Sequence, residues 1–320
     1  MSVQPRPMRE VFAEALCELA EDFPRMVVLD ADVSSSTRTR LFAERHPDRF
    51  YNFGVAEANM VSAAAGMAAC GLVPVASSFA FLLTTRAADP VRSHVAYPNL
   101  NVKLAGGYAG LSDFADGASH QSVMDLAVMR AMPNMTVLAP SDIETTRGAV
   151  RAMLAAAGPA YLRLSRQPVG SLHGGDEGFE IGRARTLRDG GDVVLAVCGT
   201  LTGEALAAAE ALAAEGVEAA VVEFATVKPL DVGALAAAAG RARAVVTVEE
   251  HGIHGGLGGA VAEALGETRP VPLRRVGVRD TFAESGPYEA LLEKYGLTAP
   301  HIAAAAREAL AAPARTPAGP

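Results

Sequence analysis

Short apolar runs alternate along this chain with longer alanine-rich or amphipathic segments, and this alternation restricts the fold more than any other feature. Buried strands are expected at residues 26–30, 73–79, 101–105, 136–139, 161–164, 192–200, 217–224 and 244–250. Helices are expected between them, at residues 8–20, 58–70, 143–157, 203–215 and 231–240. Strands that alternate with helices form mostly parallel sheets. The predicted fold class is therefore α/β, with two open, mostly parallel sheets.

A change of composition at residues 165–191 divides the chain in two. This stretch holds Pro168 and several glycines among charges of both signs, whereas the parts on either side keep the strand–helix alternation. A chain of 320 residues has room for two domains of about 100–200 residues each. The expected divisions are a first domain at 1–168, a linker at 169–190, a second domain at 191–311 and a disordered tail at 312–320.

Composition excludes several classes of partner. Half of the residues are hydrophobic and the net charge is −8 with scattered basic residues, which argues against binding nucleic acid or an anionic membrane. The first twenty residues carry charges throughout and lack the apolar run of a signal peptide. The three cysteines, Cys17, Cys70 and Cys198, lie far apart, as is typical of small buried hydrophobes in a reducing cytosol. These features predict a cytoplasmic protein.

One segment is apolar enough to suggest a membrane helix. Residues 58–85 contain no charged side chain. Gly71 and Pro74 interrupt the segment, however, and a serine pair follows. We therefore expect a small-residue helix that leads into a buried strand, and no membrane span.

The polar residues that follow the first strands point to a site. In open sheets of this kind, ligands bind at the carboxyl ends of the strands. Between residues 52 and 134 the chain presents an acid in GVAEANM (54–60), an aromatic residue in VASSFAF (Phe79) and the loop DGASHQS (116–122).

Six fragments in order give the chain a resemblance to a known family. They are ADVSSST (31–37), FYNFGVAEANM (50–60), VPVASSFAFLLTTRAADPVR (73–92), YAGLSDFADGASHQS (108–122), RAMPNMTVLAPSD (130–142) and YLRLSRQP (161–168). From about residue 8 to 310 the chain resembles the C-terminal half of transketolase, and above all the separately encoded C-terminal subunit of split transketolases. The resemblance implies a pyrimidine-binding domain followed by a C-terminal domain, and thiamine diphosphate as the cofactor.

The same resemblance assigns the cofactor contacts. Glu57 matches the catalytic glutamate that hydrogen-bonds the pyrimidine ring of the cofactor; on its own, it could equally be an acid at a helix N-terminus. Phe79 matches the aromatic residue that stacks on that ring, although a core phenylalanine is the alternative. Leu82 and Ala88 stand at two further positions where relatives carry aromatic residues. Leu82 is nevertheless counted among the cofactor-binding positions.

Substrate contacts follow in the same way. Asp116 and His120 match the pair that binds the ketose hydroxyls, and His120 is also counted as catalytic. Arg9, Ser36 and Arg166 match positions that bind the substrate phosphate, for which the planar guanidinium is well suited. Two residues depart from the family. Tyr108 replaces a histidine, which bears on contacts with the substrate hydroxyls, and Ala115 replaces an acid, which bears on contacts with the neighbouring subunit. A shifted sugar specificity is therefore expected.

One half of the cofactor site is missing. The metal-binding motif of these enzymes is Gly-Asp-Gly, and the nearest stretches here, 175–177 and 191–193, lack the last glycine. We therefore expect no metal ligand in this chain. An N-terminal transketolase subunit is expected to hold the diphosphate and Mg²⁺, in an α2β2 complex that acts on a sugar phosphate.

Alternative functions stay open at this point. The β subunit of a 2-oxoacid dehydrogenase shares both domains, deoxyxylulose phosphate synthase is a further relative, and a non-catalytic assembly protein could keep the fold. The glycine-rich turn at 251–265 follows a strand and opens a helix, but without a suitably placed acid it is weak evidence for nucleotide binding. The leading prediction is a two-carbon ketol transfer from a ketose phosphate to an aldose.

Overall fold

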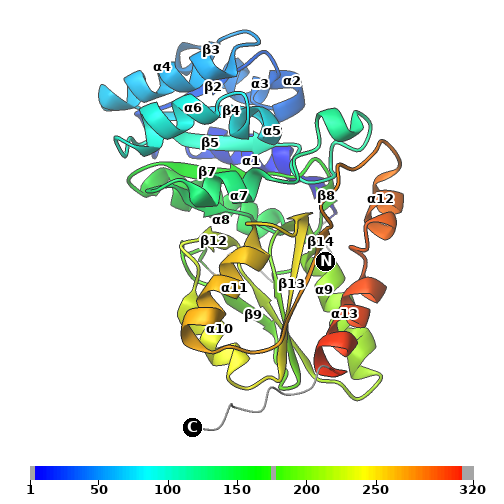
Figure 1. Cartoon of the computed structure of the whole chain (residues 1–320). Helices are drawn as coiled ribbons and strands as arrows, with labels where there is room; N and C mark the ends of the chain where they lie inside the picture. Colours follow the sequence, from blue (N-terminus) through cyan, green and yellow to red (C-terminus); the bar gives the residue numbers. More distant parts are fainter. Residues whose placement is uncertain (1–3, 174–177, 312–320) are drawn as a thin grey trace.

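The computed structural model describes residues 4–173 and 178–311 of the chain. The predicted tail at 312–320 and the Gly175-Asp176-Glu177 stretch lie outside the described residues. Within them, two sheets stand one above the other, and helices cover both faces of each sheet (Figure 1).

The first sheet has seven strands in the order β12-β6-β7-β5-β4-β2-β3. The strands from the first half of the chain are β2 (Met26–Asp30), β3 (Phe50–Asn52), β4 (Val73–Phe79), β5 (Lys103–Gly107), β6 (Thr136–Leu138) and β7 (Ala160–Arg163). They pair in parallel. Their carboxyl ends therefore lie along one edge of the sheet.

Alternating side chains attach helices to both faces of this sheet. In β2, Val27 and Leu29 pack against one cluster, which includes Met60 of helix α4. Met26 and Val28 point to the other cluster, with Phe12 of helix α1. The helices and turns of this half are α1 (Met8–Glu18), α2 (Ser34–Thr37), α3 (Arg40–Arg45), η1 (Pro47–Arg49), α4 (Glu57–Ala69), α5 (Ala80–Thr84), α6 (Ala88–Pro90), η2 (Val91–Ala96), η3 (Gly117–Ser119), α7 (Asp125–Ala131) and α8 (Ile143–Ala155).

The second sheet has five strands in the order β14-β13-β10-β11-β9. Its strands are β9 (Arg185–Arg188), β10 (Val193–Val197), β11 (Ala219–Glu223), β13 (Ala244–Gly252) and β14 (Leu273–Val278), and β9 alone runs antiparallel to its neighbour. Helices α9 and α13 lie together on one side, and α10 and α11 on the other (Figure 1). Their bounds, with those of the remaining elements, are η4 (Gly199–Leu201), α9 (Thr202–Ala213), α10 (Val232–Ala239), α11 (Leu257–Thr268), α12 (Tyr288–Lys294) and α13 (Ala299–Ala311).

The two halves of the chain are joined by more than the connecting segment. Strand β12 (Thr226–Lys228) belongs to the second half, yet it pairs antiparallel with β6 at the edge of the first sheet. The short strands β1 (Arg6–Pro7) and β8 (Pro168–Val169) form a separate antiparallel pair. One hydrophobic cluster runs from Val137 in the first half to Val222 and Leu235 in the second. The halves therefore share part of their core.

The structure confirms the predicted fold class, and it adds detail that the pattern did not give. The charge-free segment 58–85 lies within α4, β4 and α5, as a helix followed by a strand. Among the helices of the described residues, none is both long enough and apolar enough to cross a lipid bilayer. Cys17 and Cys198 are buried as predicted, whereas Cys70 is exposed, because it follows the last turn of α4 at the surface.

Candidate active site

Loops that follow four neighbouring strands meet at the carboxyl edge of the first sheet. The loops follow Asp30 of β2, Phe79 of β4, Gly107 of β5 and Arg163 of β7. This is the edge at which open parallel sheets bind ligands.

Tyr108 lies at the centre of these loops. Its ring is 4.6 Å from that of Phe79, and the guanidinium carbons of Arg9 and Arg166 lie 5.4 Å and 5.2 Å from its centroid. Arg9 also donates a hydrogen bond to the Tyr108 hydroxyl. The backbone of Tyr108 has φ 59°, in the left-handed region, which costs a side-chain-bearing residue roughly 1–3 kcal/mol. The fold thus holds this ring close to two cations.

Arg9 reaches this place from the first turn of α1. Its Nη1 donates to the backbone carbonyl of Ser36, at 3.1 Å, in the short helix α2 that follows β2. Its Nε is buried and has no hydrogen-bond partner in the described part of the chain. A buried donor without a partner is costly. An anion that accepted from this nitrogen would remove that cost.

Asp30 shapes the loop that carries Ser36. The carboxylate of this fully buried residue accepts hydrogen bonds from the Thr37 and Thr39 hydroxyls, at 2.9 and 2.8 Å, and from the amide of Val33, at 2.7 Å. Burial raises the pKa of Asp30, and these three hydrogen bonds oppose that rise.

An aromatic wall follows β4. Phe79 ends the strand, and its ring centroid is 6.0 Å from that of His120, while the ring centroid of Phe81 is 5.1 Å from that of His120. Leu82 is buried in α5. The hydroxyl of Ser78, next to Phe79, is buried and has no hydrogen-bond partner among the described residues. The wall therefore offers the apolar rings of Phe79 and Phe81 around His120.

Two acids lie in the loop between β5 and α7, at residues 108–124. Asp113 is fully buried, and its Oδ1 is 3.5 Å from Nη1 of Arg166. Burial first, and then the neighbouring carboxyl of Asp116, raise the pKa of Asp113 to about 6, while His120 and Arg166 oppose the rise. Asp116 itself is exposed, as a contact to a substrate requires.

The second half of the chain holds this loop in place. The buried carboxylate of Glu250, in β13, accepts from the amide of Leu111 at 2.6 Å and from the hydroxyls of Thr200 and Tyr288. The amide of Gly286 donates to the carbonyl of Phe114 at 3.0 Å. The second half of the chain therefore fixes the candidate substrate loop through hydrogen bonds to Leu111 and Phe114.

Glu57 lies in the first turn of α4 and is almost completely buried. Its carboxylate binds Nη1 of Arg86 at 3.2 Å, and the Arg86 side chain is half exposed. Arg86 follows α5, the helix that begins directly after Phe79. In the described residues no hydrogen bond or ring contact links Glu57 to the group around Tyr108. Glu57 therefore contacts the segment that follows Phe79, through Arg86, and has no contact with Arg9 or Arg166 among the described residues.

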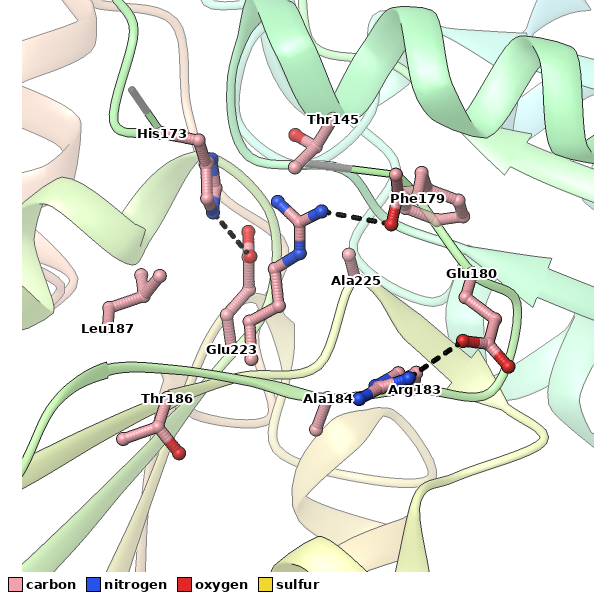
Figure 2. Close-up of a pocket in the computed structure, with 12 residues that line it drawn as sticks. Thr145, His173, Phe179, Glu180, Arg183, Ala184, Thr186, Leu187, Glu223 and Ala225 are labelled. Atoms are coloured by element: carbon pink, nitrogen blue, oxygen red, sulfur yellow. Dashed lines mark hydrogen bonds and ion pairs between the residues drawn. The ribbon is translucent and has the colours of Figure 1, made fainter. Parts of the chain in front are cut away.

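A separate cavity of about 460 Å³ lies between the halves, and its lining in the described residues does not include the group around Tyr108. His173 and Glu223 meet at one of its walls, and Glu180 and Arg183 pair at another (Figure 2). Nδ1 of His173 lies 2.7 Å from Asp142, the N-cap of α8. Hydrogen bonds to Asp142 and Glu223 raise the pKa of His173 to about 10, so that this cation is enclosed by two carboxylates.

The structure brings together most of the residues that the sequence nominated. Arg9, Arg166 and Phe79 contact Tyr108. Ser36 joins this group through Arg9, and His120 joins it through Phe79. Asp116 interacts with Asp113, and Leu82 is buried in α5. Sequence reasoning missed Asp113 and Arg86. Both occur inside fragments that carried the resemblance, but nothing in the pattern marks which acid is buried or which arginine reaches back to Glu57. Among the described residues, no group of three or more histidine, cysteine or acidic side chains could hold a metal ion.

Comparison with known families matches nearly the whole chain. Residues 4–171 match the transketolase pyrimidine-binding domain, and residues 182–302 match the transketolase C-terminal domain.

Individual relatives agree with the two domain matches. The chain is 44% identical over 301 residues to the 6-deoxy-6-sulfo-D-fructose transketolase subunit SqwH of Clostridium sp. (strain MSTE9), covering 94% of both chains. It is also 44% identical over 299 residues to a putative transketolase C-terminal section of Methanocaldococcus jannaschii, covering 92% of this chain and 94% of that one.

Solved structures give the same picture. A structure described as a split gene transketolase, inactive beta4 tetramer, superposes with a TM-score of 0.89 at 47% identity, over 95% of this chain and 98% of that one. The transketolase of Leishmania mexicana superposes with a TM-score of 0.81 at 26% identity, and there the chain covers only 46% of the longer protein.

Proposed function

The chain belongs to the transketolase family through both of its domains, and from this we propose that it is the C-terminal subunit of a split transketolase. With an N-terminal subunit it would transfer a two-carbon ketol unit from an anionic ketose to an aldose. The observation that carries the proposal is the pair of arginines around Tyr108 at the edge where Phe79 and His120 also lie.

The residues present fit the pyrimidine half of thiamine diphosphate. Bound here, the cofactor would supply a nucleophilic carbon and an electron sink, which protein side chains lack. Phe79 would offer its ring face, and Glu57 would hold a proton at the ring nitrogen, once its carboxylate exchanges Arg86 for the cofactor.

Arg9 and Arg166 would bind the terminal anion of the donor. A phosphate and a sulfonate both present three oxygens in a tetrahedral arrangement, and guanidinium groups bind such anions with paired hydrogen bonds. The unpartnered Nε of Arg9 supports an anionic ligand. The name of the Clostridium relative refers to a sulfonated ketose, so we propose both a phosphorylated and a sulfonated ketose as donors to be tested. Asp116 and His120 would orient the hydroxyl groups.

An N-terminal subunit would complete the enzyme. We propose that it holds Mg²⁺ and the diphosphate, because the chain has no Gly-Asp-Gly motif, and that two copies of each subunit form an α2β2 complex in the cytoplasm, where sugar phosphates are metabolised. The solved relative described as an inactive tetramer of one chain type supports a need for the second subunit.

Calorimetry with this chain, alone and mixed with a candidate N-terminal subunit, tests the proposal. Thiamine diphosphate with Mg²⁺ should bind to the mixture only, and the mixture should transfer a ketol unit from one of the two donors. Tight binding to this chain alone would show that the site is not split. Cofactor binding to the mixture without transfer from either donor would favour a non-catalytic protein.

The first variant to assay in the mixture is Glu57→Gln. Removing the proton-holding group should lower kcat by about 100-fold or more, while the exposed acid Glu21, changed to Gln, serves as the matched control. Full activity of Glu57→Gln would show that the catalytic assignment is wrong.

A further inference from the structure

The buried carboxyl of Asp113 has one oxygen that the structure leaves without a partner. Oδ1 faces Arg166 at 3.5 Å, a long contact for an ion pair. Oδ2 is buried and, in the described part of the chain, no donor reaches it. An ionised carboxylate with an unsatisfied oxygen in a fully buried position is unfavourable. Asp113 therefore needs either a further donor or a proton.

Asp116, which lies close to Asp113 in the same loop, favours the protonated form of Asp113. Asp116 lies three residues further along the same loop, and its hydrogen bond to Asp113 and its charge both raise the pKa of Asp113. Two ionised carboxylates cannot face one another at that range without strong repulsion, and such pairs hold one proton between them. The other charged groups that face Asp113 are His120 and Arg166, and both favour its ionised form.

We propose that Asp113 and Asp116 share one proton, and that Asp113 is a positioning residue that controls through this proton how firmly Arg166 binds an anion. With the proton in place, Asp113 donates to Asp116, and the guanidinium of Arg166, stacked over Tyr108 and Phe114, is available to a ligand. When the proton leaves to solvent, the Asp113 carboxylate attracts Arg166 and repels an incoming anion. The inference rests on the proposed function in one respect, the role of Arg166 as an anion-binding residue.

Sulfate is the probe for the first test, because it keeps two negative charges from about pH 5 to about pH 8, whereas phosphate titrates within that range. Calorimetry compares sulfate binding to the whole chain and to Asp113→Asn. At about pH 5 the two proteins should bind sulfate equally, since neither carries a charge at position 113. At about pH 8 the natural chain should bind about tenfold more weakly than the variant, as one nearby like charge would produce. The imidazole of His120 is common to both proteins, so its own titration cancels in the comparison.

The alternatives give different results in the same experiment. If Asp113→Asn bound sulfate more tightly than the natural chain by the same factor at both pH values, Asp113 would be ionised throughout and would share no proton. No difference at either pH, with sulfate bound by both proteins, would show that Asp113 has no influence on Arg166. No sulfate binding by either protein at about pH 5 would show that Arg166 is no anion site, and would overturn the inference together with that part of the proposed function. Asp189→Asn, an exposed change in the second domain, is the matched control and should follow the natural chain.

Infrared spectroscopy tests the proton without any ligand. The difference spectrum between the natural chain and Asp113→Asn at about pH 5 should contain the C=O stretching band of a protonated carboxyl. This band should disappear as the pH rises through the Asp113 pKa of about 6. Its absence would overturn the inference.

A second variant covers the case in which Asp113→Asn does not fold. Asp116→Asn changes an exposed side chain, and it should lower the pH at which the Asp113 band disappears; an unchanged midpoint would overturn the shared proton.

Neither the sulfate titration nor the infrared measurement requires ketol transfer. A band without transferase activity would therefore count against the proposed function alone, and an active enzyme without the band against the shared proton alone.

Discussion

At the scale of single residues, Tyr108 does more than replace a family histidine. Its hydroxyl accepts from Arg9, its ring lies beside both guanidinium groups, and the same ring contacts Phe79. One side chain therefore connects the proposed anion site with the proposed cofactor wall. A histidine at this position would have a shorter reach, and the arginines would be positioned differently.

Tyr108→Phe should weaken donor binding more than it slows turnover. The change removes one hydrogen bond to a charged group, worth about 1.5–3 kcal/mol, and keeps the ring. We expect KM for the anionic donor to rise about tenfold or more, with kcat nearly unchanged, in steady-state assays of the reconstituted enzyme. Tyr97→Phe is the control, since Tyr97 is 85% exposed. A fall in kcat at constant KM would assign the hydroxyl to the chemical step instead.

The sequence nominated most residues of this site but not their contacts. Arg9, Phe79 and Arg166 were found because fixed fragments carry them. Arg9 donates to the backbone carbonyl of Ser36 and not to the Ser36 hydroxyl. This choice depends on how α1 packs against α2, which the fragments do not show. Asp113 was missed because an acid in a polar loop carries no sign of burial until the second domain covers the loop.

At the scale of elements, close packing between strands and side chains decides which glycines are required. A Cβ added at Gly106 in β5 would lie 2.5 Å from the hydroxyl oxygen of Tyr161 and 2.7 Å from its ring. Tyr161 is fully buried, and its hydroxyl donates to Asp125 at 2.8 Å. Asp125 in turn binds Arg163. The ring therefore has little freedom to move.

Gly106→Ala should destabilise the protein. Inserting one methyl group into a packed core costs about 1–3 kcal/mol, and here the displacement would also disturb the hydrogen bond to Asp125. Gly66→Ala is the matched control: it lies on the exposed side of α4 with no atom within 4 Å of the added Cβ, and should be neutral or stabilising by up to about 1 kcal/mol. Denaturant unfolding measures both, and equal stability of the two variants would contradict the packing argument.

Long apolar elements were predictable, and short ones were not. Strands β2 and β10 have almost uninterrupted apolar sequences, so their positions follow from pattern alone. Strand β9 has the sequence RTLR and β12 has TVK, and neither is apolar enough to be read as a strand. Each pairs with a strand that is distant in sequence, β9 with β11 and β12 with β6, and a local pattern does not contain that partner.

At the scale of the whole molecule, buried charges connect the two halves. Asp142 caps α8 in the first half, Glu223 ends β11 in the second, and His173 lies between them as a shared cation. Although burial alone would raise the pKa of Asp142, hydrogen bonds from His173 and Thr145 hold it well below its usual range. The halves should therefore unfold together.

His173→Gln should weaken the whole protein in a pH-dependent way. Loss of the cation leaves two buried carboxylates unpaired, which costs roughly 3–5 kcal/mol. The folded pKa of His173, about 10, lies above its ordinary value of 6.5, so its contribution is complete below about pH 6.5 and is lost as the pH rises through about 10. The stability gap between the natural chain and His173→Gln should narrow over that window.

Thermal unfolding followed at two wavelengths measures that gap. The exposed His94, changed to Gln, is the control and should leave the melting temperature unchanged. Separate transitions for the two halves in His173→Gln alone would also support the linking role, whereas a gap that is constant with pH would contradict it.

Strand β12 comes from the second half of the chain but pairs with β6 of the first sheet, and this pairing has a practical consequence for truncation. A fragment that ended near residue 171, where the first family match ends, would lack β12 and would expose the edge of β6 with its backbone amides and carbonyls free. Uncovered edges of this kind recruit strands from other molecules and lead to aggregation. The boundary that divides the chain in sequence is thus no safe place to cut it. A self-contained first domain would have to carry its own replacement for Thr226–Lys228.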